Sequence, residues 1–245
     1  MKKLYYDLHI HSCLSPCGDN DMTPNNIAGM SKLNGINIAA LTDHNSTLNC
    51  PAFFAAAERY EVTPVAGMEL TTAEDIHMVC LFETLEAAMD FGSEISRRRV
   101  LIPNKPAIFG EQLILDSEDE PVGSEKYLLP NAVNITIDEA VKLSRDFGGV
   151  CWPAHVDRDS NGIIAALGTF PEELDVGFAE FNRSENIEKY RELYPALKKK
   201  AVVVSSDAHY LESLRDASEW FELGGETDEE IRKELFEKLR QGVMP

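Results

Sequence analysis

The sequence predicts an α/β protein with a largely parallel β-sheet or barrel. Short apolar runs rich in β-branched residues alternate with amphipathic segments, and this alternation is typical of repeated βα units. The length of 245 residues fits one large domain of this class. The expected strands are residues 3–10, 36–42, 62–69, 77–82, 148–154, 176–181 and 200–206.

Start and stop signals predict three of the intervening helices. Thr23 and Pro24 supply a cap and a first-turn proline for one helix. Thr136 and Thr227 each precede a glutamate by three positions, which is the pattern of a capping box. The matching stop signals are glycines: Gly35, Gly148 and Gly242.

Two segments depart from the alternation. The residues between Glu69 and His77 are too few for a helical crossover, so we expect a hairpin-like return that brings His77 back beside Glu69. Residues 100–134 contain no βα unit, and the run from 112 to 129 is expected to form a β-hairpin with an acidic turn. We expect this segment to be an insertion over one mouth of the barrel, where it would shape substrate entry.

Composition limits the classes of partner. The net charge is −19, from 42 acidic and 23 basic residues, so the chain lacks the basic surface with which proteins bind long nucleic acids. We therefore expect no long nucleic-acid partner, although a small anionic substrate is compatible with bound cations. No apolar run is long enough to span a membrane, and the N-terminus does not read as a signal peptide.

Cysteine usage indicates a reducing compartment. The five cysteines form no regular disulfide framework, and Cys80 and Cys151 lie in apolar runs where they are expected to be small buried hydrophobes. We therefore expect a cytoplasmic protein. The oligomeric state is not predicted.

The six histidines carry most of the functional information. Each lies at or beside the edge of an expected strand, and most have an acidic residue within two positions. In the first strand, His9 and His11 point to the same face, so their imidazoles can converge on one metal ion. Considered alone, this pair is also compatible with a strand whose histidines face solvent.

The remaining motifs repeat this placement at the ends of other strands, where active sites of parallel α/β proteins assemble. A capping role for Asp43, a solvated Glu69 and a satisfied core His155 are the ordinary interpretations of single motifs. Closing a barrel would nevertheless draw all of these side chains into one mouth. The combined set suits zinc, manganese or iron and consists of His9, His11, His44, Glu69, His77, His155, Asp207 and His209.

The order of the motifs DLHIHS, LTDHN, GMEL, a following histidine, PAH and SSDAH resembles the polymerase and histidinol phosphatase (PHP) domain family over about residues 5–210. The resemblance implies a single domain over residues 1–245 that forms a distorted (β/α)7 barrel. It also implies a centre of two or three divalent ions (Zn, Mn or Fe) and phosphoesterase activity.

The resemblance further implies three sets of metal ligands. One ion would take His9, His11, Glu69 and Asp207, and a second would share Glu69 with His77 and His155. A third would take His44 and His209 with a ligand from the loop after the first motif. Asp19 is our choice for that ligand, while Cys17 and Asp21 remain alternatives.

The expected reaction is hydrolysis of a small phosphate ester, a phosphorylated metabolite or nucleotide, by metal-activated hydroxide. Glu69 would bridge the ions, and His209 or Asp43 would protonate the leaving group. Arg158, Arg183 and Asn182 are expected to bind the substrate, although a surface ion pair is an equally good interpretation of Arg158. The alternatives are a metal-dependent amidohydrolase and a non-catalytic metal-binding regulatory module.

Overall fold

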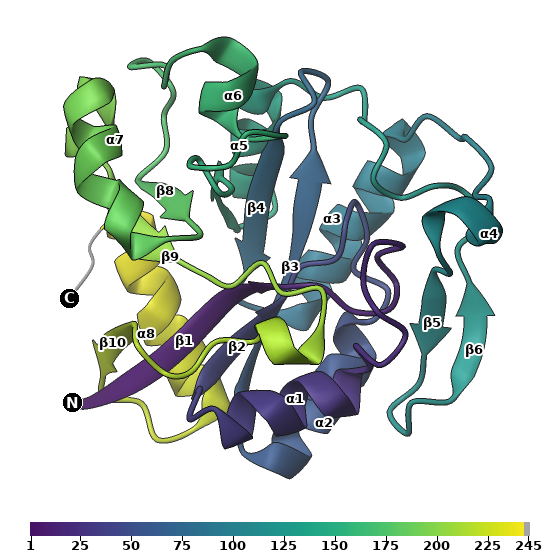
Figure 1. Cartoon of the computed structure of the whole chain (residues 1–245). Coiled ribbons are helices and arrows are strands. Elements are labelled where there is room, and N and C mark those ends of the chain that lie inside the picture. The colour runs from purple at the N-terminus through teal and green to yellow at the C-terminus, as the bar shows by residue number, and fades with distance from the viewer. Residues whose placement is uncertain (243–245) are drawn as a thin grey trace.

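The computed structural model describes residues 1–242, and its central feature is a mixed β-sheet that curls into a half-barrel (Figure 1). Six strands pair in the order β10–β1–β2–β3–β4–β7. Their bounds are Trp220–Leu223 for β10, Lys2–Ile10 for β1, Ile38–Leu41 for β2, Thr63–Thr71 for β3, His77–Phe82 for β4 and Val150–Pro153 for β7. Strands β1, β2 and β3 are parallel, whereas β10, β4 and β7 run antiparallel to their neighbours.

A separate parallel pair continues the curl. It consists of β8 (Phe178–Phe181) and β9 (Ala201–Val204). Backbone hydrogen bonds just beyond the strand ends join this pair to its neighbours. Val156 N–H donates to the backbone carbonyl of Glu180, and Asp207 N–H donates to the backbone carbonyl of His9. The ends of β7, β8, β9 and β1 therefore meet at one rim.

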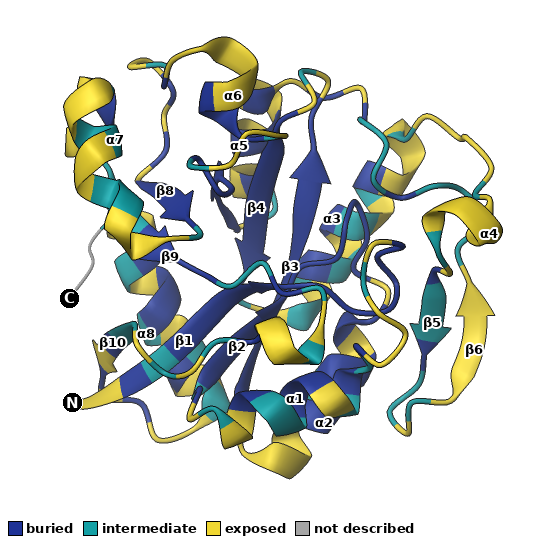
Figure 2. Cartoon of the chain, in the orientation of Figure 1, coloured by how far each residue is buried: buried dark blue, intermediate teal, exposed yellow. Residues whose placement is uncertain are grey.

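Helices cover the outside of the sheet and close one end of it. The helices are α1 (Pro24–Leu33), α2 (Cys50–Tyr60), α3 (Leu85–Arg98), α4 (Pro106–Phe109), α5 (Ile137–Asp146), α6 (Ile163–Leu167), α7 (Ile187–Leu193) and α8 (Asp228–Gln241). Leu235 and Phe236 of α8 belong to the same buried hydrophobic cluster as Leu4 of β1 and Val65 of β3. Figure 2 shows the strands β2, β3, β4 and β8 as buried, while much of α4, α7 and β6 is exposed. The polar residues lie at the strand ends opposite α8.

The predicted helix signals are confirmed. Thr23 caps α1 with its side chain, and both predicted capping boxes, at Thr136 and Thr227, are formed. The predicted stop glycines have positive φ angles, a conformation that glycine adopts without a Cβ clash: Gly35, Gly148 and Gly242.

The sheet prediction holds only in part. The return between Glu69 and His77 is confirmed, since β3 and β4 form an antiparallel pair in which Thr71 lies opposite His77. The expectation of a largely parallel sheet is wrong, because this short return and the antiparallel β4–β7 and β1–β10 pairs make the sheet mixed. The short strand β10 was not among the expected strands. The count of seven βα units stays a prediction.

The segment 100–134 contains α4 and an antiparallel pair of strands, β5 (Leu113–Leu115) and β6 (Pro121–Ser124). Its status as an insertion stays a prediction. Asn49, at the start of α2, holds it in place: its amide oxygen accepts from Leu115 N–H, and its amide nitrogen donates to Leu113 and to Ser12 Oγ. Among the described helices, none is long and apolar enough to span a membrane.

Candidate metal centre

The structure brings eight of the predicted ligands together at the rim opposite α8. They lie at strand ends or directly after them: His9, His11, His44, Glu69, His77, His155, Asp207 and His209. Each imidazole has a neighbour whose ring centroid lies 4.2–5.3 Å away. The histidines that are scattered along the chain thus form one cluster.

Glu69 lies at the centre of this cluster and is fully buried. Its Oε1 lies 2.8 Å from His77 Nδ1, 2.9 Å from His155 Nε2 and 3.3 Å from His9 Nε2. Its Oε2 lies 3.0 Å from His44 Nδ1 and 3.2 Å from His11 Nε2. Burial opposes ionisation of Glu69, but the surrounding imidazoles outweigh burial and hold its pKa well below the ordinary value. The carboxylate is therefore charged and can serve more than one cation.

Three groups of side chains place their ligand atoms within 4.8 Å of one another. Two of the groups share Glu69, and two share His11. The groups are His9, His11, Glu69 and Asp207; His44, Glu69 and His77; and His11, His44 and His209. Imidazole nitrogens combined with carboxylate oxygens suit zinc, manganese or iron.

Hydrogen bonds behind the imidazoles determine which ring nitrogen faces the centre. His9 Nδ1 lies 2.7 Å from a carboxylate oxygen of Glu180, an acceptor, so Nδ1 carries the proton. His11 Nδ1 lies 3.0 Å from Ser15 Oγ, which donates its own proton to Asp43 at 2.7 Å. Ser15 Oγ must then accept from His11 Nδ1, and in both neutral rings Nε2 is the bare nitrogen.

The two bare nitrogens, His9 Nε2 and His11 Nε2, are only 3.1 Å apart. Two lone pairs at that distance repel each other unless a proton or a cation lies between them. The buried atoms Glu69 Oε2 and Asp207 Oδ1 also accept no well-aligned hydrogen bond from the described residues, although imidazole nitrogens lie close to both. Burial opposes protonation of His11, but Asp207 and Glu69 outweigh it and raise the pKa of the imidazole to about 9. The cluster therefore attracts positive charge, and its residues fit divalent cations.

Two candidate ligands have strained backbones. His155 and Asp207 have φ angles of +27° and +53°, in the left-handed region that is unfavourable for residues with a Cβ. The Asp207 N–H donates to the backbone carbonyl of His9 at 2.9 Å, and the His155 N–H donates to the carboxylate of Glu180 at 3.3 Å. Such strain is concentrated at functional sites, where neighbouring contacts maintain it.

The proton-donor roles of Asp43 and His209 stay predictions, and the structure shows the surroundings of both side chains. Both oxygens of Asp43 accept hydrogen bonds from the loop behind His11, at 2.6 Å from Ser12 Oγ and 2.7 Å from Ser15 Oγ. Asp43 therefore accepts from the same serine hydroxyl that lies beside His11 Nδ1. Burial and the neighbouring His11 lower the pKa of His209 to about 3, so that imidazole is neutral at neutral pH.

The predicted third-site ligand Asp19 is not among the side chains of the three groups, and its role stays a prediction. Its backbone N–H donates to the backbone carbonyl of His209, while its exposed carboxylate accepts from Asp21 N–H at 2.8 Å. Cys17, one of the two alternatives, lies close enough to His44 to influence the pKa of that imidazole. Burial lowers the pKa of His44, but Cys17 and Glu69 together outweigh burial and raise it to about 9. The chemistry of its carboxylate favours Asp19, and the path of the loop decides between Asp19, Cys17 and Asp21.

The predicted substrate-binding residues line one cavity beside the centre. Arg158, Asn182 and Arg183 border a space of about 390 Å³. The guanidinium of Arg158 forms an ion pair with Asp207, the candidate ligand, rather than with its sequence neighbours Asp157 and Asp159. The cavity is thus connected to the metal centre through one ion pair.

Sequence reasoning missed Glu180 and Ser15. Glu180 is a fully buried carboxylate in the apolar strand β8, and a charge inside an apolar run was a usable signal. Ser15 gave no such signal, since serine is common in loops and only its contacts reveal its position behind His11.

Comparisons with known proteins agree with this geometry. The model of the PHP domain family matches residues 7–143. A protein from Bifidobacterium adolescentis assigned as a metal-dependent phosphoesterase superposes with a TM-score of 0.55 at 17% identity, covering 84% of this chain and 88% of its own. Comparison with curated proteins gave no match.

A second likeness corrects the prediction about nucleic acid. The lesion-specific endonuclease Q from Pyrococcus furiosus superposes with a TM-score of 0.63 at 20% identity over 95% of this chain. The chain spans about half of that protein, or 55% of its length. A second structure shows endonuclease Q in complex with a 27-mer duplex that has an abasic lesion at the active site, and it matches equally well. The TM-score is 0.63 at 20% identity, and the match covers 95% of this chain and 56% of that one. The exclusion of long nucleic acids was therefore wrong, because net charge does not report the local field of a site that collects cations.

Proposed function

Because this chain belongs to the PHP domain family, we propose that it is a metal-dependent phosphoesterase that hydrolyses a small phosphate ester, with a phosphomonoester as the first candidate. The observation that carries the proposal is the position of Glu69, whose two oxygens lie within 3.3 Å of five imidazoles. A buried carboxylate in that position is suited to bridging cations.

Two or three divalent ions (Zn, Mn or Fe) would be held by the clustered side chains. The first would be bound by His9, His11, Asp207 and Glu69, and the second by Glu69, His77 and His155. A third would be bound by His44 and His209 with one residue of the loop 17–21. When bound, such ions lower the pKa of water from about 15.7 towards 7 and neutralise the charge of phosphoryl oxygens.

The residues of the chain would bind and orient the substrate. Arg158 faces the cavity beside the centre, and its guanidinium can donate two parallel hydrogen bonds to phosphoryl oxygens. Arg183 and Asn182 line the same cavity and would contact the remainder of the substrate. Glu180 and the Asp43–Ser15 pair would keep Nε2 of His9 and His11 directed at the centre.

A second candidate substrate is a phosphodiester in DNA. The observation that favours it is the similarity in fold to endonuclease Q, which was solved with a lesion-containing duplex. The chemistry at phosphorus would be the same, and the two candidates differ in the size of the group that the rim must accept.

The deciding experiment is a substrate panel with manganese, zinc or ferrous iron supplied in turn. The panel contains metabolite phosphates, a phosphodiester, a duplex with an abasic site and a cyclic amide. We expect metal-dependent phosphate release that is lost in Glu69→Gln and retained in Glu222→Gln, a matched change on the exposed side of β10. Amide turnover without phosphate release would establish an amidohydrolase, and full metal occupancy without any turnover would establish a non-catalytic module.

A further inference from the structure

Cys80 on β4 and Cys151 on β7 lie directly opposite each other in the antiparallel pair of strands. The type of pair follows from the register. Ala154 N–H donates to His77 at 3.0 Å, which makes those two residues a hydrogen-bonded pair. Met78 then faces Pro153, which has no N–H to donate.

Because the two kinds of pair alternate along antiparallel strands, Cys80 and Cys151 form a non-hydrogen-bonded pair. In such pairs the Cα atoms are about 4.5 Å apart and the side chains are closest. Disulfides are compatible with Cα separations of about 4.4–6.8 Å. The backbone therefore already has a spacing that a disulfide accepts.

The side chains agree with the backbone. The two sulfur atoms are 3.4 Å apart, both residues are buried, and both are free thiols. A disulfide requires the sulfurs to approach to about 2.05 Å, a change that side-chain torsions and a small strand movement can supply. Neither thiol takes part in the metal centre.

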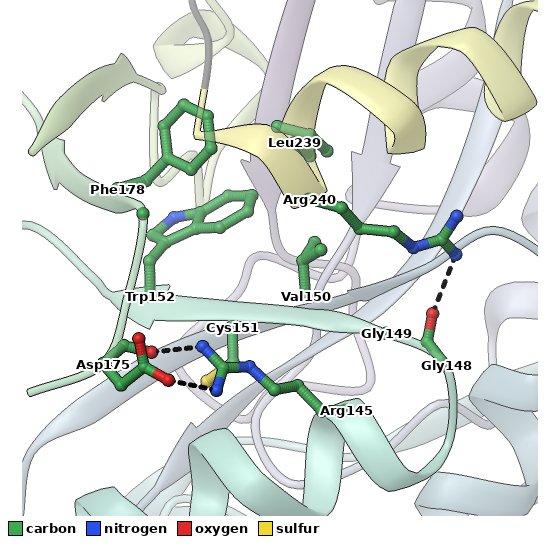
Figure 3. A pocket seen from close by; sticks show the side chains of 11 residues that line it. Arg145, Gly148, Gly149, Val150, Cys151, Trp152, Asp175, Phe178, Leu239 and Arg240 are labelled. Carbon is green, nitrogen blue, oxygen red and sulfur yellow. Dashed lines mark hydrogen bonds and ion pairs between the residues drawn. The ribbon is translucent and has the colours of Figure 1, made fainter.

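A cavity gives small reagents access to this pair. Cys151 lines a space of about 430 Å³ at the end of the sheet where β7 begins, together with Arg145, Asp175, Trp152 and Arg240. Figure 3 shows the sulfur of Cys151 beside the guanidinium of Arg145, which bonds to Asp175. Cys80 lies behind Cys151 with no exposed surface. Cys151 is therefore the thiol that meets a reagent first, and Cys80 is the thiol that resolves the product.

We propose that Cys80 and Cys151 are an oxidisable dithiol that closes to an intramolecular disulfide on reaction with a hydroperoxide. The Cys151 sulfur attacks one peroxide oxygen, the O–O bond breaks, and the sulfur becomes a sulfenic acid. The Cys80 sulfur then attacks the Cys151 sulfur and displaces the hydroxyl group as water. With hydrogen peroxide, two thiols are oxidised by two electrons and two molecules of water are released.

The disulfide would cross-link the two strands that hold a pair of candidate ligands. β4 begins at His77, and His155 follows β7 after one residue. The thiols are 71 positions apart in the chain, so the cross-link would also close a long loop and restrict the unfolded state. The proposal does not depend on the proposed function, since the thiols can be read directly.

The test uses the whole protein exposed to hydrogen peroxide, quenched with an alkylating agent in denaturant and digested without reduction. We expect mass spectrometry to find the Cys80 and Cys151 peptides joined, and dithiothreitol to separate them. Because the thiolate is the nucleophile and burial raises the pKa of Cys151, the rate is expected to rise between pH 7 and 8.5. The thermal midpoint of the oxidised protein should rise and return on reduction.

Three variants separate this reaction from general thiol oxidation. Cys17→Ser removes the exposed cysteine and should leave the joined peptides unchanged. Cys80→Ala should leave Cys151 oxidised singly, whereas Cys50→Ala, a matched change at another buried cysteine, should still give the joined peptides. The proposal is overturned if wild-type Cys80 and Cys151 are both recovered alkylated while Cys17 is oxidised.

Discussion

At the scale of single residues, the orientation of each imidazole depends on the group behind it. Glu180 accepts from His9 Nδ1, and the Asp43–Ser15 pair accepts from His11 Nδ1. Groups of this kind set the tautomer and the basicity of a metal ligand. They therefore belong to the site although they do not face its centre.

Glu180→Gln is expected to lower metal affinity about 10–100-fold, because an uncharged amide supports the His9 imidazole less well. Isothermal titration with zinc or manganese measures this change. Glu222→Gln, an exposed glutamate on β10, is the control and should bind as wild type does. Equal metal affinities for the two variants would show that Glu180 does not contribute to metal binding.

Arg158→Gln is expected to lower kcat/KM for a phosphate ester about 10–100-fold, since a hydrogen bond to a charged group contributes about 1.5–3 kcal/mol. Arg158→Lys keeps the charge without the planar fork and should recover only part of the loss. Steady-state kinetics measures both, with Arg97→Gln on the exposed surface of α3 as the control. An unchanged kcat/KM in Arg158→Gln would return Arg158 to the role of a surface ion pair.

At the scale of elements, the segment 100–134 is connected to the metal centre through Asn49. This fully buried amide bonds to both ends of β5 and to Ser12 Oγ, which in turn donates to Asp43. The loop that carries His11 and Ser15 is thereby held against β5. A rearrangement of the hairpin would be transmitted to His11.

Asn49→Ala is expected to lower the free energy of unfolding by about 2 kcal/mol, because it leaves buried backbone groups of β5 without partners. Hydrogen exchange should increase in residues 112–125 and in the loop 12–18, but not in α8. Asn26→Ala, on the exposed side of α1, provides the comparison. Uniform exchange across the molecule would show that Asn49 contributes to global stability alone.

At the scale of the whole molecule, the fold gathers six histidines and two carboxylates at one end of a sheet whose other end is closed by α8. Without cations, the carboxylates of Glu69 and Asp207 and the unprotonated imidazole nitrogens repel one another there. A ligand that binds only the folded state stabilises it by mass action. The centre is therefore expected to contribute to stability as well as to chemistry.

Removal of metal with a chelator should lower the thermal midpoint of the wild-type protein, and re-addition of zinc or manganese should restore it. The Glu69→Gln variant should respond much less, because its centre has lost the shared carboxylate. Differential scanning calorimetry at constant ionic strength measures the shift. A midpoint that is identical with and without chelator would contradict a metal centre built into the fold.

Much of the fold and of the centre could be predicted from local patterns. Short stretches of chain determine the capping boxes at Thr136 and Thr227, and they also determine the position of each histidine beside an apolar run. Periodicity and spacing therefore reveal these features. The short return between Glu69 and His77 likewise required an antiparallel pair. These features are decided by neighbours in sequence.

The sequence by itself determined which kinds of candidate metal ligand the protein has, their order, and their placement at strand ends. Only the tertiary structure decided that Glu180 lies beside His9 Nδ1, that Asp43 accepts from Ser15, and that Cys17 lies near His44. The physical reason is that side-chain direction depends on contacts between elements far apart in the chain. Periodicity within one element places a residue on a face, but it does not specify what lies opposite.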